Sequence, residues 1–247
     1  MSRWQTAQVH EKDFWESRSK LKPSDRPEYN DYIQFIEKHL HLDKNTRILE
    51  IGCGPQTLVE RMNGELYGLD PLMNYFLSTY QMEKNVNWQQ GIGESLPYKD
   101  NFFDLIIIGN VLDHTESPAK VLEESYRCLK PNGFIFLVQN CYDSNFTKFK
   151  KFMEKIKLGD SCHPHTFTLN RIRNIFNSKG FKLISERPGF ELSSSYEVEP
   201  NSKKINRLIK EKGIGYLIKH LIIRALNFVP KHIFKTYSLH VFMAKKV

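Results

Sequence analysis

Residues 46–56 read Thr46-Arg-Ile-Leu-Glu-Ile-Gly-Cys-Gly-Pro-Gln56. The apolar run in this stretch has the length of a buried strand, and the apolar spacing after the two glycines is typical of a helix. Gly52 and Gly54 suit a tight turn, because backbone without a Cβ atom can take positive φ and lets a ligand come close. Glu50 adds a carboxylate beside the turn. We therefore predict a ligand-binding turn between a strand and a helix.

Asp70 ends a second strand-like run, Leu66-Tyr-Gly-Leu-Asp70. Nucleotide-binding folds place an acid about 20 residues beyond a glycine-rich turn, where it binds ribose hydroxyls. Asp70 can also be explained as the N-cap of the helix that follows, and the two roles are compatible.

Short apolar runs alternate with helix-like segments along the chain, which predicts an α/β fold with a parallel sheet. Right-handed crossovers then bring the carboxyl ends of the strands to one edge, where ligands of such sheets bind. The expected strands are 48–51, 66–70, 86–90, 102–108, 134–138, 181–185 and 239–244. The loop 91–97 and the residues from Asn110 to His114 should share that edge.

The length of 247 residues favours one large domain with insertions. We expect an N-terminal helical cap over residues 1–44 and an α/β domain that carries the ligand-binding turns over residues 45–247. Two segments interrupt the alternation, at about 142–165 and 201–236, and we expect them to be helical insertions.

Charge is unevenly distributed along the chain. Residues 1–140 hold 15 Lys and Arg against 20 Asp and Glu, a net charge of −5, and residues 141–247 hold 21 against 8, a net charge of +13. The basic half points to an anionic partner such as a membrane surface, nucleic acid or a phosphorylated substrate, or simply to a solvated basic face.

The four cysteines are Cys53, Cys128, Cys141 and Cys162. Their scatter, without a CxxC pair, favours a reducing compartment over a disulfide framework or a zinc site. The first residues lack the apolar stretch of a secretory signal, and no apolar run reaches the ~18 residues of a spanning helix. We expect a cytoplasmic protein, with peripheral membrane attachment as an option.

Four stretches in this order and spacing resemble the class I S-adenosylmethionine-dependent methyltransferases: LEIGCG at 49–54, GLDPL at 68–72, GIGESLP at 91–97, and FDLIIIGNVLDH through LKPNG at 103–133. The resemblance implies a Rossmann-like, seven-stranded, mostly parallel sheet of order 3-2-1-4-5-7-6, with helices on both faces. It also implies an antiparallel last strand, which residues 239–244 fit.

The same resemblance implies S-adenosylmethionine as cofactor and assigns residues to its parts. Glu50 would lie near the methionine ammonium, Asp70 would accept the ribose hydroxyls, and Leu72 would pack on the adenine. The implied cofactor-binding residues are Glu50, Gly52, Cys53, Gly54, Gln56, Asp70, Pro71, Leu72, Ile92, Gly93, Glu94, Asn110 and Val111.

Two positions depart from the family pattern. Gln56 stands where a third glycine is common, and it could bond the methionine carboxylate. Ile92 stands where an acid often bonds the adenine amino group, which leaves the recognition of adenine to backbone groups or Glu94.

A dinucleotide dehydrogenase is the nearest alternative family. Its fingerprint needs glycine at position 57, where Thr57 stands, and Pro55 removes an N–H that a pyrophosphate would use.

Methyl transfer by this family is a direct displacement in which the protein supplies alignment. An oxygen or carbon acceptor, which we favour, also needs a base. His114 is the first candidate because it follows the edge strand, and His165 with His163 come next. Asp113 and His114 could instead only shape the edge. Cys162-His163-Pro-His165 has no partner cluster elsewhere in the sequence, so we expect no metal.

The acceptor pocket should be roofed by residues 1–32 and 142–165, whose aromatic residues suit a small or amphipathic acceptor or serve as core packing.

Residues 201–236 could dock on an anionic membrane with a lipid-linked acceptor, pack as a helical cap or form a dimer surface. The nucleobase-methylating Asn-Pro-Pro-Tyr motif is absent at Asn110, although other RNA methylation stays open. A cofactor-binding partner subunit without catalysis is the non-enzymatic alternative.

Overall fold

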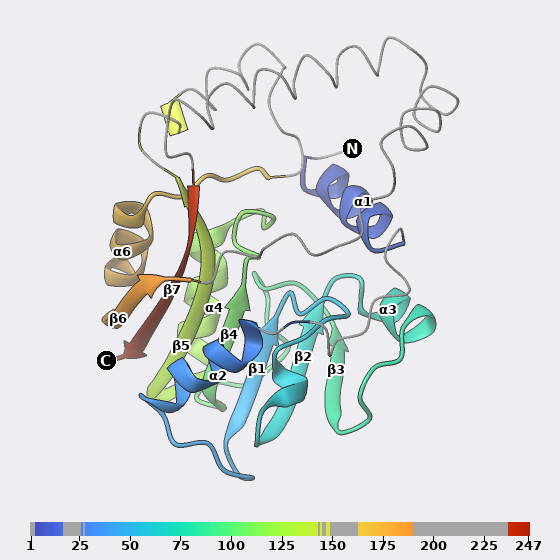
Figure 1. Cartoon of the computed structure of the whole chain (residues 1–247), viewed down its shortest axis with the longest axis horizontal. Helices are drawn as coiled ribbons and strands as arrows, with labels where there is room; N and C mark the ends of the chain where they lie inside the picture. Colours follow the sequence, from blue (N-terminus) through green and yellow to red (C-terminus); the bar gives the residue numbers. More distant parts are fainter. Residues whose placement is uncertain are drawn as a thin grey trace.

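A single sheet of seven strands organises the protein (Figure 1). The computed structural model describes residues 3–16, 26, 28–142, 144, 147–148, 163–189 and 237–247. The sheet has the order β3-β2-β1-β4-β5-β7-β6, which confirms the order implied by the family resemblance. The strands are β1 (Arg47–Ile51), β2 (Glu65–Asp70), β3 (Val86–Gln90), β4 (Phe103–Gly109), β5 (Leu129–Tyr142), β6 (Phe181–Pro188) and β7 (Tyr237–Lys246).

The directions of the strands bring several carboxyl ends to one edge of the sheet. β1 pairs in parallel with β2 and β4, and the parallel pairing continues to β3 and β5. β7 runs antiparallel to both of its neighbours, β5 and β6, as expected for the last strand. The carboxyl ends of β1, β2, β4 and β5 therefore meet at one edge, which is where open α/β sheets bind ligands.

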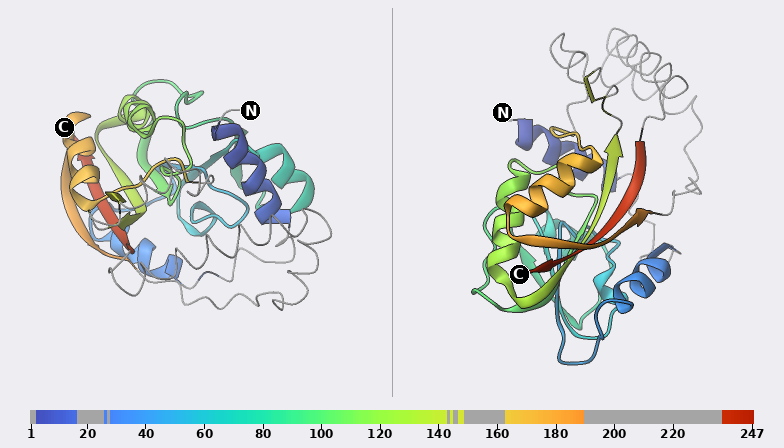
Figure 2. Two further views of the ribbon diagram at one scale, coloured as in Figure 1. Left: turned by 90° about the horizontal axis from the view of Figure 1, so that it is seen from above. Right: turned by 90° about the vertical axis from the view of Figure 1, so that its left-hand side faces the viewer.

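Helices cover both faces of the sheet (Figure 2). On one face, α4 (Pro118–Cys128) and α6 (Leu169–Ser178) bury side chains such as Val121 and Phe176 against the strands. On the other face, α2 (Glu28–Glu37) and the short 3-10 helix η2 (Val59–Arg61) pack through residues such as Tyr32 and Val59. Two apolar layers, one on each face, hold the sheet rigid beneath its ligand edge.

Helix caps lie where the sequence indicates them. The side chain of Ser117 accepts a hydrogen bond from the N–H of Lys120 at the start of α4, and Pro118 occupies the first turn. Thr168 accepts a hydrogen bond from the N–H of Arg171 at the start of α6. Gly180 follows α6 with a φ of 82°, the left-handed conformation that commonly ends a helix.

The helix expected directly after Gly54 is a wrong prediction. The chain there forms only the single turn η2. Leu58 and Val59 are buried as the apolar spacing suggested, but the N–H of Val59 donates to the Glu50 carboxylate instead of to a helical carbonyl. β5, β6 and β7 also extend beyond the strands expected from their apolar runs.

The first helix, α1 (Arg3–Glu16), lies over the carboxyl ends of the strands and beside α3 (Met73–Thr79) (Figures 1 and 2). Trp15 packs on the small cluster of Cys53, Met73 and Phe76, and its carbonyl accepts a hydrogen bond from Tyr80 at 2.5 Å. α1 is therefore joined to the carboxyl edge of the sheet through Trp15.

The segment 201–236 and most of the segment 142–165, expected to be helical insertions, lie outside the described residues. Within the part of the chain that the structure does describe, no helix combines the length and apolar character needed to cross a lipid bilayer.

Candidate functional site

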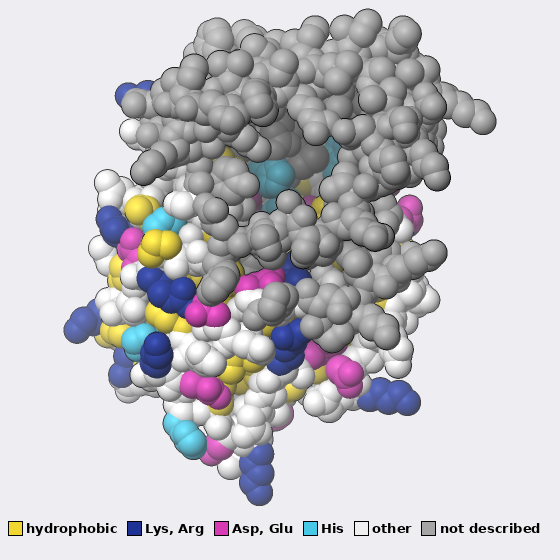
Figure 3. Space-filling view, viewed as in Figure 1, with side chains coloured by type: hydrophobic (Ala, Val, Ile, Leu, Met, Phe, Trp, Pro, Cys, Tyr) yellow, Lys and Arg dark blue, Asp and Glu magenta, His cyan; other side chains and the backbone are white. Residues whose placement is uncertain are grey.

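A cavity of about 830 Å³ opens at the carboxyl ends of β1, β2, β4 and β5, beneath α1. Figure 3 shows the molecule hollowed at this end, with histidine side chains inside the hollow. Ten of the thirteen residues predicted to hold a cofactor line this cavity: Glu50, Gly52, Cys53, Gly54, Gln56, Asp70, Pro71, Leu72, Asn110 and Val111. Segments that are distant in the sequence thus converge on one space.

The turn after β1 forms the floor of the cavity. Gly52 and Gly54 have φ values of 65° and 58°, in the left-handed region that glycine adopts without strain. A Cβ atom on Gly52 would lie 2.5 Å from a methyl carbon of Val111, and one on Gly54 would lie 3.3 Å from the indole of Trp15. Only glycine at position 52 allows the turns after β1 and β4 to approach this closely.

Glu50 is buried in the wall of the cavity, only 4% exposed. One of its carboxylate oxygens accepts a 2.8 Å hydrogen bond from the N–H of Val59. Burial raises the pKa of Glu50 to about 8, although the N–H groups of Val59 and Leu58 oppose the shift. A cation placed beside this carboxyl would restore its charged form.

The carboxylate of Asp70 accepts hydrogen bonds from two backbone N–H groups. Its Oδ2 accepts from the N–H of Gly54 at 3.0 Å, and its Oδ1 accepts from the N–H of Leu72 at 2.8 Å. These bonds fix the carboxylate at the junction of the turns after β1 and β2. Burial raises the pKa of Asp70 to about 6, and the two N–H groups oppose the shift while Glu11 adds to it. The prediction that Asp70 caps the following helix is wrong, because α3 begins at Met73 with Leu72 at its N-cap position and no side-chain cap bond, whereas Asp70 lines the cavity.

The turn after β4 carries Asn110, which has a φ of 56° although it is not glycine. Asparagine tolerates this conformation better than most residues. Its N–H donates to Val138 at 2.7 Å, and its side-chain oxygen accepts from Asn140 at 2.8 Å. The Asn110 side chain is therefore held at the cavity wall by the neighbouring strand β5.

The loop after β3 lies in a second, smaller cavity of about 40 Å³. Ile92, Gly93 and Glu94 line it together with Val111 and Pro71, which line the large cavity as well. This loop therefore lies next to the main cavity but does not line it.

One carboxylate oxygen of Glu94 already accepts hydrogen bonds from the backbone of this protein. Its Oε1 accepts from the N–H groups of Glu116 and Ser117, at 2.7 and 3.1 Å, in the approach to α4. The prediction that Glu94 recognises adenine is therefore weakened, because this oxygen already serves the backbone.

The histidines predicted as bases lie in different surroundings. Nδ1 of His114 lies 3.4 Å from Oε1 of Glu11, and the ring of His163 lies 4.6 Å from that of His114 between centroids. Both rings line the large cavity. His165 is not among its lining residues; its Nε2 lies 3.2 Å from the carbonyl oxygen of Glu116.

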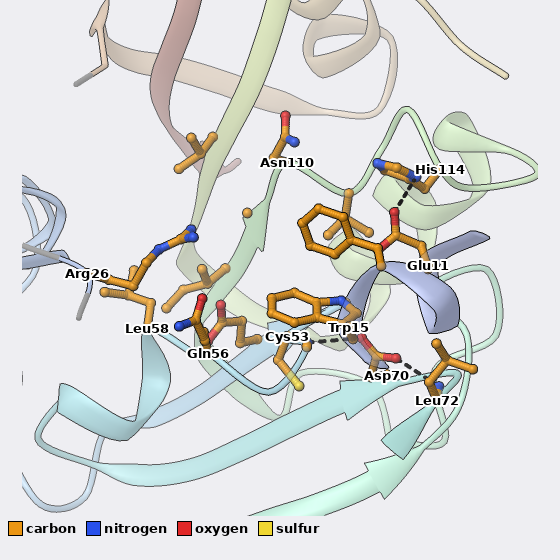
Figure 4. A pocket seen from close by; sticks show the side chains of 18 of the residues that line it. Glu11, Trp15, Arg26, Cys53, Gln56, Leu58, Asp70, Leu72, Asn110 and His114 are labelled. Carbon is orange, nitrogen blue, oxygen red and sulfur yellow. Dashed lines mark hydrogen bonds and ion pairs between the residues drawn. The ribbon is translucent and has the colours of Figure 1, made fainter. Parts of the chain in front are cut away.

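Side chains from α1 and its surroundings complete the site, and sequence reasoning missed most of them. Figure 4 shows Gln56 and Arg26 on one side of the cavity, Asp70 and Leu72 on the other, and Trp15 between them. Arg26 forms a 2.7 Å ion pair with Glu28. Of the aromatic roof that the sequence predicted, Trp15, Tyr29 and Tyr32 line the cavity. No local pattern marked Glu11 or Arg26, since their role depends on where the chain places them.

A family model described as a methyltransferase domain matches residues 49–137. The sterol 24-C-methyltransferase of Kluyveromyces lactis is 23% identical over 159 residues, which cover 59% of this chain and 43% of that protein. The demethylmenaquinone methyltransferase of Anoxybacillus flavithermus is 32% identical over 113 residues, which cover 41% of this chain and 48% of that protein. The aligned part of the chain thus spans less than half the length of these relatives.

A solved structure supports the same fold. The phosphoethanolamine N-methyltransferase 2 of Haemonchus contortus, in complex with S-adenosylmethionine, has a TM-score of 0.55 at 15% identity. The alignment covers 88% of this chain and 52% of that one. Identity at this level shows a shared fold.

Proposed function

Residues 49–137 form a class I methyltransferase domain, a family whose cofactor is S-adenosylmethionine, and from this premise we propose that the chain methylates a small or amphipathic acceptor at oxygen or carbon. The observation that carries the proposal is the convergence of Glu50, Asp70 and Asn110 on one cavity large enough for a cofactor and an acceptor.

The residues present fit this cofactor. Glu50 is a buried carboxyl with a raised pKa, and the methionine ammonium would supply the cation that such a group lacks. Asp70, fixed by Gly54 and Leu72, would accept the ribose hydroxyls. Gln56 and Arg26, which lie together on one side of the cavity (Figure 4), would face the methionine carboxylate. Bound there, the cofactor supplies an activated methyl group on a sulfonium.

His114 is the proposed base. Glu11 faces its Nδ1 at 3.4 Å, and Figure 4 shows the other ring nitrogen directed away from Glu11, toward the side of the cavity where Asn110 lies. With Nδ1 protonated, Nε2 would remain an acceptor for a proton from the acceptor molecule. A base in this position is worth roughly 10²–10⁴-fold for an oxygen or carbon acceptor.

The lining favours an acceptor with an apolar body. Trp15, Tyr29 and Tyr32 contribute aromatic surface to the cavity, while Arg26 and the histidines supply a few polar groups. Such a mixture is typical of sites for small amphipathic molecules. The names of two relatives agree with it, since one methylates a carbon of a sterol and the other acts on demethylmenaquinone.

Cofactor binding is the first test. S-adenosylhomocysteine at 100 times its dissociation constant should raise the free energy of unfolding of the full chain by ~2.7 kcal/mol in a thermal-shift titration. The absence of a shift with both S-adenosylhomocysteine and S-adenosylmethionine would overturn the proposal. A shift without methyl transfer to any fraction would favour the non-catalytic partner subunit instead.

The acceptor is the second test. Transfer of radiolabelled methyl groups from the cofactor into cell extract, separated into lipid, RNA, protein and small-molecule fractions, should label the lipid or small-molecule fraction. Label in the RNA fraction would overturn the proposed acceptor class, because it would show that the acceptor is RNA.

Membrane attachment is tested separately, by co-sedimentation of the full chain with anionic vesicles at low salt. The absence of binding to these vesicles would discard a membrane-surface role.

A further inference from the structure

Three potential metal ligands gather beside the proposed acceptor site. Asp113, His114 and His163 each offer one ligand atom, and these atoms all lie within 4.8 Å of one another. Asp113 and His114 belong to the turn after β4, whereas His163 comes from a segment far along the chain. Two contacts of His165 bring this segment to the turn: its N–H donates to the carbonyl of Asp113 at 3.3 Å, and its ring contacts the carbonyl of Glu116.

The state of Asp113 points to an absent ligand. Its side chain is only 2% exposed, and within the described part of the chain no hydrogen-bond donor reaches its Oδ1. A buried carboxylate oxygen without a donor is costly, and native proteins rarely leave one in that state without an ion or a water. Asp113 is therefore a buried carboxyl group that offers one oxygen within 4.8 Å of a ring nitrogen of His114 and of His163.

Glu11 places a carboxylate within ion-pair distance of His114, although among the described residues Nδ1 of His114 neither accepts nor donates a hydrogen bond. Its carboxylate lies 3.4 Å from Nδ1 of His114, on the side away from the remaining ring nitrogen. Metal-binding histidines usually give their second nitrogen to a carboxylate or carbonyl, which fixes the tautomer and the direction of the ring. This contact joins α1 to the cluster.

We propose that Asp113, His114 and His163 bind one divalent transition-metal ion, with Zn²⁺ the best match. Two imidazoles and one carboxylate suit zinc and similar first-row ions better than Mg²⁺ or Ca²⁺, which prefer oxygen ligands. Three protein ligands leave a coordination position open. Because His114 and His163 line the cavity, that position faces the acceptor region.

The function of such an ion deepens the proposed methyl transfer and rests on it. An ion at this wall would hold an oxygen atom of the acceptor and fix its orientation toward the cofactor. With the ion bound, His114 would hold the metal through a ring nitrogen, and a hydroxyl of the acceptor on the ion would lose its proton to water; without the ion, His114 is the base proposed above. Metal binding itself depends only on the three side chains, so it can be tested independently of activity.

The test measures Zn²⁺ binding to the full chain after treatment with a chelator, by competition with a chromophoric zinc indicator. We expect one ion per chain, and a loss of affinity of about tenfold or more in each of Asp113→Asn and His163→Gln. His41→Gln removes an exposed histidine outside the cluster and should bind zinc like the wild type. X-ray absorption of the zinc-loaded chain should show nitrogen and oxygen ligands at ~2.0–2.2 Å and no sulfur.

Two results would overturn the proposal: no binding of Zn²⁺ by the wild type, or equal binding by the wild type and both cluster variants. Sulfur ligands in the absorption spectrum would move the site to cysteines and equally reject it. S-adenosylhomocysteine binding to the metal-free chain is measured in parallel. Cofactor binding without zinc binding rejects the metal site alone, and zinc binding without cofactor binding rejects the proposed function alone.

Discussion

Nδ1 of His114 lies 3.4 Å from Oε1 of Glu11, so the turn after β4 is joined to the first helix of the chain. The Glu11 side chain reaches over the cavity from α1 (Figure 4). α1 is therefore part of the wall of the cavity as well as a cover for it, because its Glu11 lines the cavity beside His114.

Removing the His114 ring should impair chemistry far more than cofactor binding. We expect His114→Asn to lower kcat by roughly 10²–10⁴-fold, whether the ring acts as a base or holds an ion, and to change the dissociation constant of S-adenosylhomocysteine little. Single-turnover methyl transfer and calorimetric titration measure the two quantities. His165 contacts Glu116 outside the lining of the cavity, so His165→Asn should lower kcat much less. Equal losses in the two variants would contradict this assignment.

Asp70 should matter for the cofactor and for the turn that holds it. An amide in its place can accept only through one oxygen, so Asp70→Asn leaves either Gly54 or Leu72 facing a donor, at a cost of about 1–3 kcal/mol in stability. Loss of the ribose acceptor should weaken S-adenosylhomocysteine binding about tenfold or more, measured by calorimetry.

Glu65→Gln is the matched control for Asp70→Asn, since Glu65 begins the same strand at its opposite end and does not line the cavity. It should leave cofactor affinity within about twofold of the wild type. A similar loss of affinity in both variants would mean that the strand, and not the Asp70 carboxylate, decides binding.

Gly52 should not tolerate a methyl group. Gly52→Ala forces a left-handed residue, at a cost of about 1–2 kcal/mol, and drives its Cβ into Val111. Thermal unfolding should show a clear loss of stability, and Val111→Ala in the same chain should recover the steric part of it. Gly109→Ala is the control, because the nearest atom to its Cβ lies 3.9 Å away, at Glu50. A stable Gly52→Ala protein would contradict the close approach of the two turns.

Glu50 should make the stability of the ligand-free protein depend on pH. Its pKa is raised from 4.5 to about 8 by burial, so the folded state holds a proton that the unfolded state has lost between these values. The stability associated with the protonated group is full below about pH 4.5 and is lost as the pH rises through 8. Glu50→Gln should remove this loss, which chemical denaturation at several pH values measures. An unchanged pH dependence in Glu50→Gln would mean that Glu50 is ionised in the fold.

The same shift predicts a proton release on cofactor binding. A cationic ammonium favours the ionised form of Glu50, so S-adenosylhomocysteine should bind more tightly as the pH rises from about 6 to about 7.5. Calorimetry in buffers of different ionisation enthalpy measures the released proton. Glu50→Gln should bind more weakly and release no proton through this group.

The sheet and the meeting of Glu50, Asp70 and Asn110 at one cavity could be predicted because their determinants are local. The apolar runs around Leu49 and Ile106 specify strands, the glycines and Asp70 follow strand ends, and the crossover rule brings those ends together. The helix predicted after Gly54 failed for a non-local reason, because Glu50 takes the N–H that a helix would use. Glu94 likewise serves the backbone before α4, which its place in the loop did not indicate.

By itself, the sequence determined that this chain builds a seven-stranded α/β sheet with Glu50, Asp70 and Asn110 at one edge, since the hydrophobic periodicity and the residues of the turns act over a few positions. Only the tertiary structure decided which side chains meet above that edge: Glu11 with His114, and Asp113 with His163. Those meetings depend on how separate segments pack, and packing is set by the summed contacts of the whole fold, which no short stretch of sequence contains.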